Sequence, residues 1–133
     1  MYSLYTDGAS RGNPGSAAYA FFLFERDRII YFDGKVIGVQ TNNFAEYTAL
    51  ICGINYVLKL QIKNITCFLD SELVVKQING EYAVKDKNLY GLFNKVNKLK
   101  LFFNSINFVH IPREQNFLSD RLVNIILDNA ELN

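Results

Sequence analysis

Hydrophobic and polar residues alternate along the chain with two different periods, one typical of strands and one typical of helices. Short runs rich in aromatic and β-branched residues, separated by polar or glycine-rich stretches, predict strands. These runs are Tyr2–Thr6, Ala17–Glu25, Arg28–Val36, Ile65–Leu69 and Ile106–His110. The stretch Gly8–Ser16 and the polar residues 25–28 are typical of turns, so the first three strands should form an antiparallel meander.

Four other segments place apolar residues at helical spacing. They run from Asn42 or Asn43 to about Leu60, from Ser71 to Ile78, from Lys87 to about Phe102, and from Gln115 or Asn116 to about Ala130. Asn42 or Asn43 and Ser71 carry the side-chain oxygens typical of helix N-caps, and Asn79-Gly80 is a typical helix end.

The resulting element order is βββαβααβα. The last two strands each follow a helix, and parallel strands need such crossovers. We therefore expect an α/β fold in which three antiparallel strands and then two parallel strands form a five-stranded mixed sheet flanked by helices. The length of 133 residues suits one domain that spans residues 1–133.

The composition narrows the function classes without choosing one. Half of the residues are hydrophobic, and the net charge of +1 does not favour nucleic-acid binding by charge alone. A polyanionic ligand would have to be bound locally, partly through metal ions. Cys52 and Cys67 are expected to be buried free thiols. No apolar run reaches the roughly 18 residues that span a membrane. No secretion signal precedes the first predicted strand, so we expect a cytoplasmic protein without a membrane segment.

Four carboxylates are the candidates for chemistry. Asp7 and Asp70 each follow directly on a predicted strand, whereas Glu46 and Asp120 lie in about the first turn of predicted helices. The carboxyl ends of parallel strands share one rim of a sheet, so Asp7 and Asp70 should lie side by side, and helix starts can reach the same rim. Any one of these acids could be only a cap or a surface-turn residue. Together they are hard oxygen ligands suited to Mg²⁺ or Mn²⁺, which points to metal-assisted cleavage of a phosphodiester.

Four stretches around these acids resemble the motifs of a known family, in the family's order. They are Tyr5-Thr6-Asp7-Gly8-Ala9-Ser10-Arg11-Gly12-Asn13-Pro14-Gly15, Thr41-Asn42-Asn43-Phe44-Ala45-Glu46-Tyr47, Asp70-Ser71-Glu72-Leu73-Val74-Val75, and His110-Ile111-Pro112-Arg113-Glu114-Gln115-Asn116 through Asp120. On these residues the chain resembles the ribonuclease HI family, and most of all its compact subgroup found in archaea and many bacteria. The resemblance implies the ribonuclease H-like fold.

The same resemblance implies an activity and a role for each acid. The family hydrolyses the RNA strand of RNA–DNA hybrids with two Mg²⁺ ions, for which Mn²⁺ may substitute, and leaves a 5′-phosphate and a 3′-hydroxyl. By resemblance, Asp7 bridges both ions, Glu46 and Asp70 hold the ion at the leaving 3′ oxygen, and Asp120 holds the ion that activates water. Arg113 resembles the arginine that serves the compact subgroup; it could bind the scissile phosphate, or it could only pair with Glu114 or Asp120.

Residues near the acids are candidates for contacts to the substrate. They are Gly8, Ser10, Asn13, Thr41, Asn42, Asn43 and Ser71. Glycines let the backbone approach a nucleic acid closely, although the same loop could be a plain glycine-rich hairpin. By resemblance, Thr41 is a candidate for contact with a DNA phosphate, while Asn42 or Asn43 could be only a helix cap. Recognition of a hybrid depends on its wide, shallow groove and on the RNA 2′-hydroxyl.

The chain departs from many relatives in two places. The lone His110 lies at a strand end before Pro112, where we expect a structural role. The stretch Gly80–Asn88 is too short for a basic, Trp-rich protrusion, so we expect weak, salt-sensitive binding of substrate.

Three other functions stay open: a non-catalytic nucleic-acid-binding domain, a nuclease for double-stranded RNA or DNA junctions, and a structural metal-binding protein. The complete set of acids argues against the non-catalytic domain, and the absence of a Ca²⁺-loop spacing argues against the structural metal-binding protein. The sequence does not exclude the other nuclease substrates. Our expectation is a monomeric endoribonuclease specific for RNA–DNA hybrids.

Overall fold

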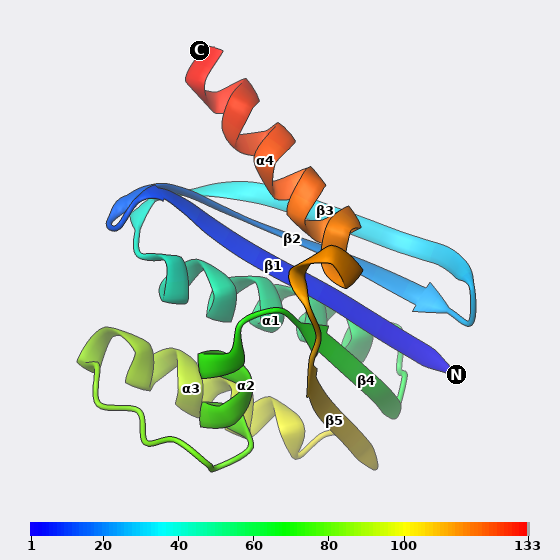
Figure 1. The fold of residues 1–133 in the computed structure, drawn as a ribbon. Coiled ribbons are helices and arrows are strands. Elements are labelled where there is room, and N and C mark those ends of the chain that lie inside the picture. The colour runs from blue at the N-terminus through cyan, green and yellow to red at the C-terminus, as the bar shows by residue number, and fades with distance from the viewer. Residues whose placement is uncertain (133) are drawn as a thin grey trace.

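A computed structural model describes residues 1–132 and contains one five-stranded sheet of order β3-β2-β1-β4-β5 (Figure 1). The strands are β1 (Tyr2–Gly12), β2 (Gly15–Glu25), β3 (Arg28–Gln40), β4 (Asn64–Leu69) and β5 (Ser105–His110). The first three strands pair in an antiparallel manner, while β1 with β4 and β4 with β5 pair in parallel. The predicted mixed sheet and the predicted element order are confirmed.

Helices cover the two faces of the sheet unequally. They are α1 (Asn42–Lys59), α2 (Glu72–Ile78), α3 (Lys87–Lys100) and α4 (Phe117–Leu132), the last preceded by a 3-10 turn, η1 (Arg113–Asn116). The first three helices lie on one side of the sheet, and α4 crosses β1, β2 and β3 on the other side (Figure 1). The sheet is therefore the middle layer of three.

The larger hydrophobic core lies between the sheet and α1. Leu4 of β1, Leu50 and Ile54 of α1, and Leu69 of β4 have no exposed surface. A smaller cluster joins Ala18 and Ala20 of β2 to Val123 and Leu127 of α4. Burial of these apolar side chains fixes both helices relative to the strands that carry the candidate acids.

The prediction of a turn over Gly8–Ser16 is wrong. The strand β1 continues through Gly12, and β2 begins at Gly15, so only two residues connect the strands. Asp7 therefore lies in the middle of a strand and not at its end. Cross-strand pairing of β1 with β2 overrides the low strand propensity of small and glycine residues. The strand β3 likewise continues to Gln40, past its predicted end at Val36.

The helix caps match the sequence in two cases out of three. Ser71 caps α2 by accepting a hydrogen bond of 3.3 Å from the Val74 amide, and Asn79 with Gly80 ends that helix, as predicted. The cap of α1, however, is Thr41, whose Oγ1 accepts from the Phe44 amide at 3.2 Å. The prediction that Asn42 or Asn43 supplies this cap is wrong.

Two expectations from composition can be compared with the fold. Both cysteines are free thiols, as predicted; Cys67 is buried, whereas Cys52 is only half-buried. Among residues 1–132, none of the helices combines the length and the apolar character needed to cross a membrane.

Candidate active site

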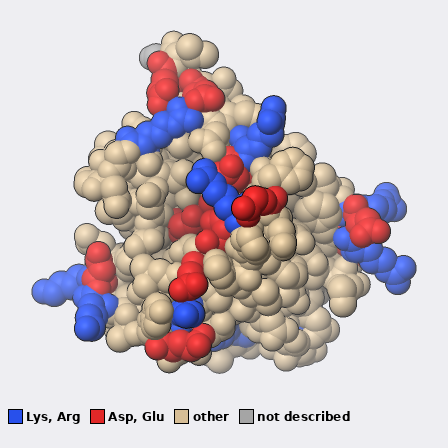
Figure 2. Space-filling model, in the orientation of Figure 1, with Lys and Arg blue, Asp and Glu red and all other residues tan. Residues whose placement is uncertain are grey.

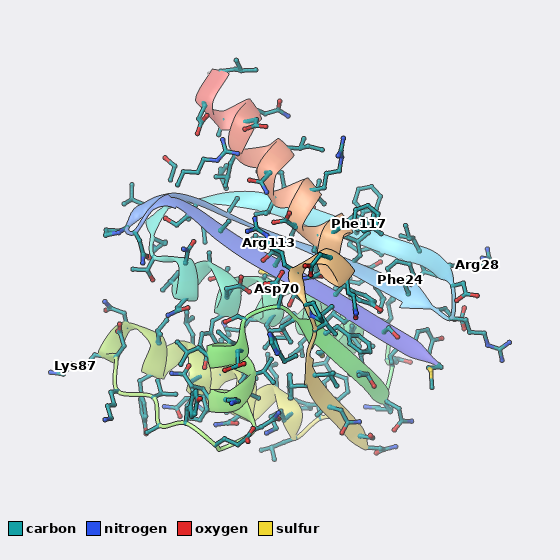
Figure 3. All side chains as sticks on the ribbon, in the orientation of Figure 1. Phe24, Arg28, Asp70, Lys87, Arg113 and Phe117 are labelled. Carbon is teal, nitrogen blue, oxygen red and sulfur yellow. The ribbon has the colours of Figure 1, made fainter. Side chains whose placement is uncertain are left out.

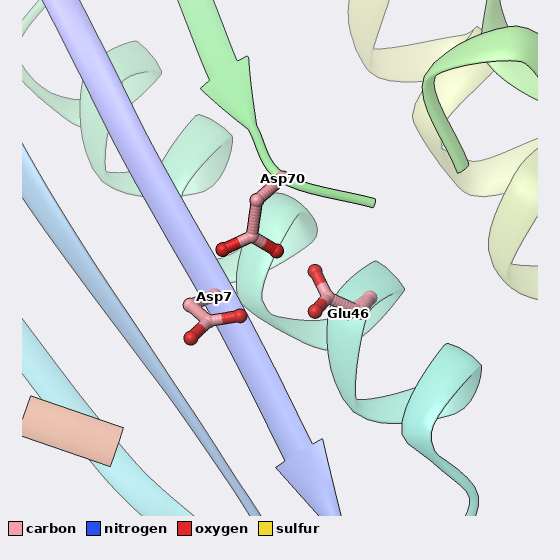
Figure 4. A group of neighbouring side chains, drawn as sticks. All are labelled: Asp7, Glu46 and Asp70. Carbon is pink, nitrogen blue, oxygen red and sulfur yellow. The ribbon is translucent and has the colours of Figure 1, made fainter. Parts of the chain in front are cut away.

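Three carboxylates lie close together at the place where β1, β4 and α1 meet. Asp7 comes from β1, Glu46 from α1, and Asp70 from the residue after β4, and their side chains point toward one another (Figure 4). One ligand oxygen from each lies within 4.8 Å of the others. Asp7 is 4% exposed and Glu46 is 7% exposed, so two of the three acids are buried.

The pairing of β1 with β4 brings Asp7 and Asp70 together. The parallel register runs from Ser3 opposite Thr66 to Thr6 opposite Leu69, and it stops there because β4 ends. Asp7 and Asp70 are the next residues on the two chains. They are neighbours as predicted, although only β4 ends at this point while β1 continues.

Gly8 allows Glu46 to join the pair. A Cβ atom on Gly8 would lie 2.1 Å from the carbonyl carbon of Ala45 and 2.4 Å from the Glu46 nitrogen, so β1 lies directly against α1. Glu46 is in the second turn of α1, not in the first turn as predicted. Gly8 thus permits a close approach of β1 to this helix. From the sequence we expected it to permit a close approach of the backbone to nucleic acid.

Burial and mutual repulsion disfavour the charged forms of these acids. Burial raises the pKa of Asp7 to about 7, and the charges of Asp70 and Asp120 contribute to this rise. Burial, followed by the charge of Asp7, raises the pKa of Glu46 well above its usual range. Burial also raises the pKa of Asp70, against the opposing effect of a hydrogen bond from Asn116.

This donor set fits a divalent cation. It offers carboxylate oxygens only, and Glu46 Oε2 is a buried oxygen without a hydrogen-bond partner among residues 1–132. Clustered carboxylates that repel one another are relieved by a bound cation, and hard oxygen ligands suit Mg²⁺ or Mn²⁺. Asp7, Glu46 and Asp70 are therefore the residues that could hold such an ion.

The metal-free protein is expected to lose stability as the pH rises from about 4 to about 7. In this range folded Asp7 still binds its proton, whereas the unfolded carboxyl, with its ordinary pKa of 3.8, has lost it. The folded state then holds more protons, so the free energy of unfolding falls with rising pH. Thermal unfolding in EDTA should give a Tm on the order of 5 °C lower at about pH 8 than at about pH 5, and Mg²⁺ should restore it at the higher pH. A metal-free Tm that increases over this range would contradict the prediction.

Asp120 is the fourth acid of the same groove but not a member of the close cluster. The groove has a volume of about 430 Å³ and is lined by all four acids together with Arg113. Arg113 Nη2 lies 3.1 Å from Asp120 Oδ1. Figure 2 shows acidic atoms gathered at the centre of this face with basic atoms beside them, and Figure 3 shows Arg113 next to Asp70. The ion pair with Asp120, which was one of the alternatives for Arg113, is thus present. It also holds the guanidinium beside the acids of the groove.

The substrate-contact candidates separate into two groups. Those that line the groove are Gly8, Ser10, Asn42, Asn43 and Ser71. Thr41 and Asn13 do not line it, and Thr41 is the helix cap described above.

A small network of hydrogen bonds connects the end of β1 and the β1–β2 turn to the end of β3 and the start of α1. The Ser10 amide donates to Asn42 Oδ1 at 2.7 Å, and the Asn42 amide donates to Asn13 Oδ1 at 3.1 Å. The Ser10 hydroxyl donates to the carbonyl of Gln40 at 2.7 Å. These bonds hold the turn at a fixed position beside the groove.

Two asparagines of the site were missed by the sequence reasoning. Asn116 donates to Asp70 Oδ2 at 3.2 Å, and Asn124 donates to the carbonyl of Asp120 at 2.8 Å and lines the groove. Asn116, Asp120 and Asn124 are spaced four residues apart, which would place them on one face of the helix that the sequence predicts from Gln115 or Asn116. This polar stripe is the signal that could have identified them.

Several known proteins are similar in sequence to this chain. The family described as reverse transcriptase-like matches residues 5–125. A bifunctional protein of Mycobacterium tuberculosis is 38% identical over 126 residues, which are 93% of this chain and 35% of that protein. Ribonuclease HI of Halobacterium salinarum is 39% identical over 127 residues, which are 95% of this chain and 64% of that protein. The chain thus spans about a third of the mycobacterial relative's length and less than two thirds of the archaeal one's.

Solved structures of relatives have the same fold. The crystal structure of ribonuclease H1 from Halobacterium salinarum superposes with a TM-score of 0.93 at 37% identity, covering 96% of this chain and 98% of that one. LC11 ribonuclease H1 in complex with an RNA/DNA hybrid superposes with a TM-score of 0.92 at 36% identity, covering 98% and 99%.

Proposed function

Because the chain belongs to the ribonuclease H family, we propose that it is an endoribonuclease that hydrolyses the RNA strand of RNA–DNA hybrids. The expected products carry a 5′-phosphate and a 3′-hydroxyl. We further propose that the enzyme is monomeric and cytoplasmic and uses two Mg²⁺ ions, for which Mn²⁺ can substitute.

The cluster of Asp7, Glu46 and Asp70 carries this proposal. Their oxygens lie within 4.8 Å of one another, and they lie in a groove of about 430 Å³ that is open to a large ligand. Such a concentration of buried negative charge would repel a polyanion unless cations neutralised it. A relative of 36% identity was crystallised with an RNA/DNA hybrid, which is the ligand proposed for this groove.

Each side chain has a part in the proposed reaction. Asp7, Glu46 and Asp70 would hold the metal ions, with Asp120 as a further ligand at the edge of the groove. Held by these carboxylates, Mg²⁺ would supply acidification of the attacking water and neutralisation of the charge on the leaving oxygen. Arg113 stays protonated, so it cannot act as a general base, but its guanidinium can bind phosphate oxygens. The network of Ser10, Asn13 and Asn42 would present a fixed polar surface to the minor groove of the hybrid.

The decisive experiment is a cleavage assay on a panel of labelled substrates. RNA–DNA hybrid, double-stranded RNA and single-stranded RNA are incubated with the purified protein and Mg²⁺, Mn²⁺ or EDTA. We expect cleavage of the RNA strand of the hybrid, dependent on metal, with 5′-phosphate ends. Cleavage that continues in EDTA would exclude the metal mechanism, and equally fast cleavage of double-stranded RNA would exclude specificity for the hybrid.

Substitution of Arg113 should weaken catalysis without affecting the fold. Its side chain is 74% exposed and pairs with Asp120 at the surface, so Arg113→Ala should change the Tm little. Loss of a charged hydrogen bond to phosphate should reduce kcat/KM about 10-fold to 100-fold. Arg113→Lys keeps the charge but not the planar fork, and it should recover only part of the activity. Arg121, an exposed arginine of α4 that is not among the groove residues, provides the control: Arg121→Ala should cleave the hybrid at the native rate.

A further inference from the structure

We propose that Asn116 is a positioning residue for the metal-binding carboxylates. Its buried side-chain amide holds two groups in one arrangement: the peptide that leads into Asp7 and the carboxylate of Asp70. This inference rests on the proposed function and deepens it, because Asn116 would act on the cations through the acids that bind them.

The contacts of Asn116 join the two acid-bearing segments. The residue lies at the end of η1 and is 1% exposed. Its Nδ2 donates to the carbonyl oxygen of Thr6 at 2.8 Å and to Asp70 Oδ2 at 3.2 Å. The Thr6 carbonyl belongs to the peptide bond between Thr6 and Asp7. One NH₂ group therefore links the backbone on which Asp7 is mounted to the side chain of Asp70.

A side-chain amide suits the chemistry of this position. A carbonyl and a carboxylate both accept hydrogen bonds, so the two N–H donors of one amide nitrogen can satisfy both, and this also fixes which way the amide faces. A carboxylate here would repel both partners, and a hydroxyl has only one proton to donate.

The remaining atom of the amide supports the same conclusion. Asn116 Oδ1 is buried and has no hydrogen-bond partner among residues 1–132. A buried acceptor without a partner is energetically unfavourable. The orientation of the side chain thus favours both N–H bonds at the expense of its own oxygen.

The bond to Asp70 restricts that carboxylate without blocking it. An ionised carboxylate has about four lone-pair sites, so acceptance from one N–H leaves most of them for a cation. Asp70 extends toward Asp7 and Glu46 (Figure 4), and a fixed rotation of its side chain keeps its free lone pairs on the cluster. Partners of this kind behind a metal ligand are worth typically about 10-fold to 100-fold in metal affinity or activity.

A purely structural role for Asn116 predicts a different result, and Ser119 provides the comparison. Ser119 is fully buried, and its hydroxyl donates to the carbonyl of Tyr5 at 3.1 Å. It therefore attaches the start of α4 to β1 one residue away from the attachment made by Asn116. Within residues 1–132, the Ser119 side chain forms no hydrogen bond to any of the four acids, so Ser119→Ala is the matched control.

The test is a Mg²⁺ titration of the full chain, followed by calorimetry and by the rise in Tm, together with cleavage of the hybrid as a function of Mg²⁺ concentration. Asn116→Ala should raise the Kd for Mg²⁺ about 10-fold or more. Its kcat should recover at high Mg²⁺, and its KM for the hybrid should stay near the native value. Ser119→Ala should lower the Tm but keep the native Kd for Mg²⁺.

The results distinguish a positioning role of Asn116 from a purely structural role. A native Kd for Mg²⁺ in Asn116→Ala, or an equal loss in Ser119→Ala, would overturn the positioning role. If Asn116→Ala does not fold, Asn116→Ser, which keeps one donor, is titrated under the same criterion. A native protein that neither binds Mg²⁺ nor cuts the hybrid would instead overturn the proposed function.

Discussion

Replacement of Asp7 by asparagine is expected to abolish metal-dependent cleavage of the hybrid while it stabilises the metal-free protein. Besides burial, the charges of Asp70 and Asp120 both raise the pKa of Asp7, whereas a hydrogen bond with Glu46 lowers it. On the proposed mechanism, the loss of this negative charge would weaken the binding of metal ions by the cluster. We expect kcat to fall on the order of 10³-fold, which corresponds to about 4 kcal/mol of transition-state stabilisation.

The gain in stability has the same electrostatic cause. At neutral pH the charged form of Asp7 is disfavoured by burial, and its pKa is raised to about 7. Asparagine has the same shape and carries no charge to bury. The Tm of Asp7→Asn in EDTA at about pH 8 should therefore exceed the native value on the order of 5 °C, and the advantage should shrink toward pH 4, where both side chains are neutral.

A matched acid elsewhere in the sheet separates this effect from a general one. Asp33 of β3 is half-buried and does not line the groove, so Asp33→Asn should keep native cleavage and native response of the Tm to Mg²⁺. An Asp7→Asn protein that cuts the hybrid at the native rate would contradict the central role of the cluster. An Asp7→Asn protein that is less stable than native in EDTA would contradict the repulsion described for it.

Gly8→Ala is expected to destabilise the fold strongly, although it adds only one methyl group. The new Cβ would lie 2.1 Å from the Ala45 carbonyl carbon and 2.2 Å from its oxygen, which are backbone atoms of α1 that cannot rotate away. The strand and the helix must separate, and overpacking of this kind costs about 3 kcal/mol. The Tm should fall roughly 10 °C, and Mg²⁺ should bind more weakly because Glu46 moves away from Asp7.

Gly91→Ala is the control for this experiment. Gly91 lies inside α3, and nothing lies within 4 Å of the Cβ that the substitution adds. Alanine is the better helix former, so this variant should be more stable than native by about 0.5–1 kcal/mol, with unchanged metal binding. Equal Tm values for the two variants, measured by thermal unfolding, would show that β1 does not contact α1 as closely as described.

Much of this molecule follows from local patterns in the sequence. The order of strands and helices, the cap at Ser71 and the helix end at Asn79-Gly80 were predicted because periodicity, caps and turn residues act over a few positions. The acids Asp7, Glu46, Asp70 and Asp120 were identified by residue type and position, and all four line one groove.

Contacts between distant parts of the chain decided the rest. The strand β1 continues past Asp7 because β2 pairs with it, which a local pattern of glycines does not reveal. Glu46 reaches Asp7 from the second turn of α1 because Gly8 lets the helix touch the strand, and Asn116 reaches Asp70 across 46 positions of sequence. The sequence by itself determined which groups are present and which elements carry them. Only packing in three dimensions determined which three acids lie within one ion's reach, because distances between segments are set by the side chains that fill the space between them.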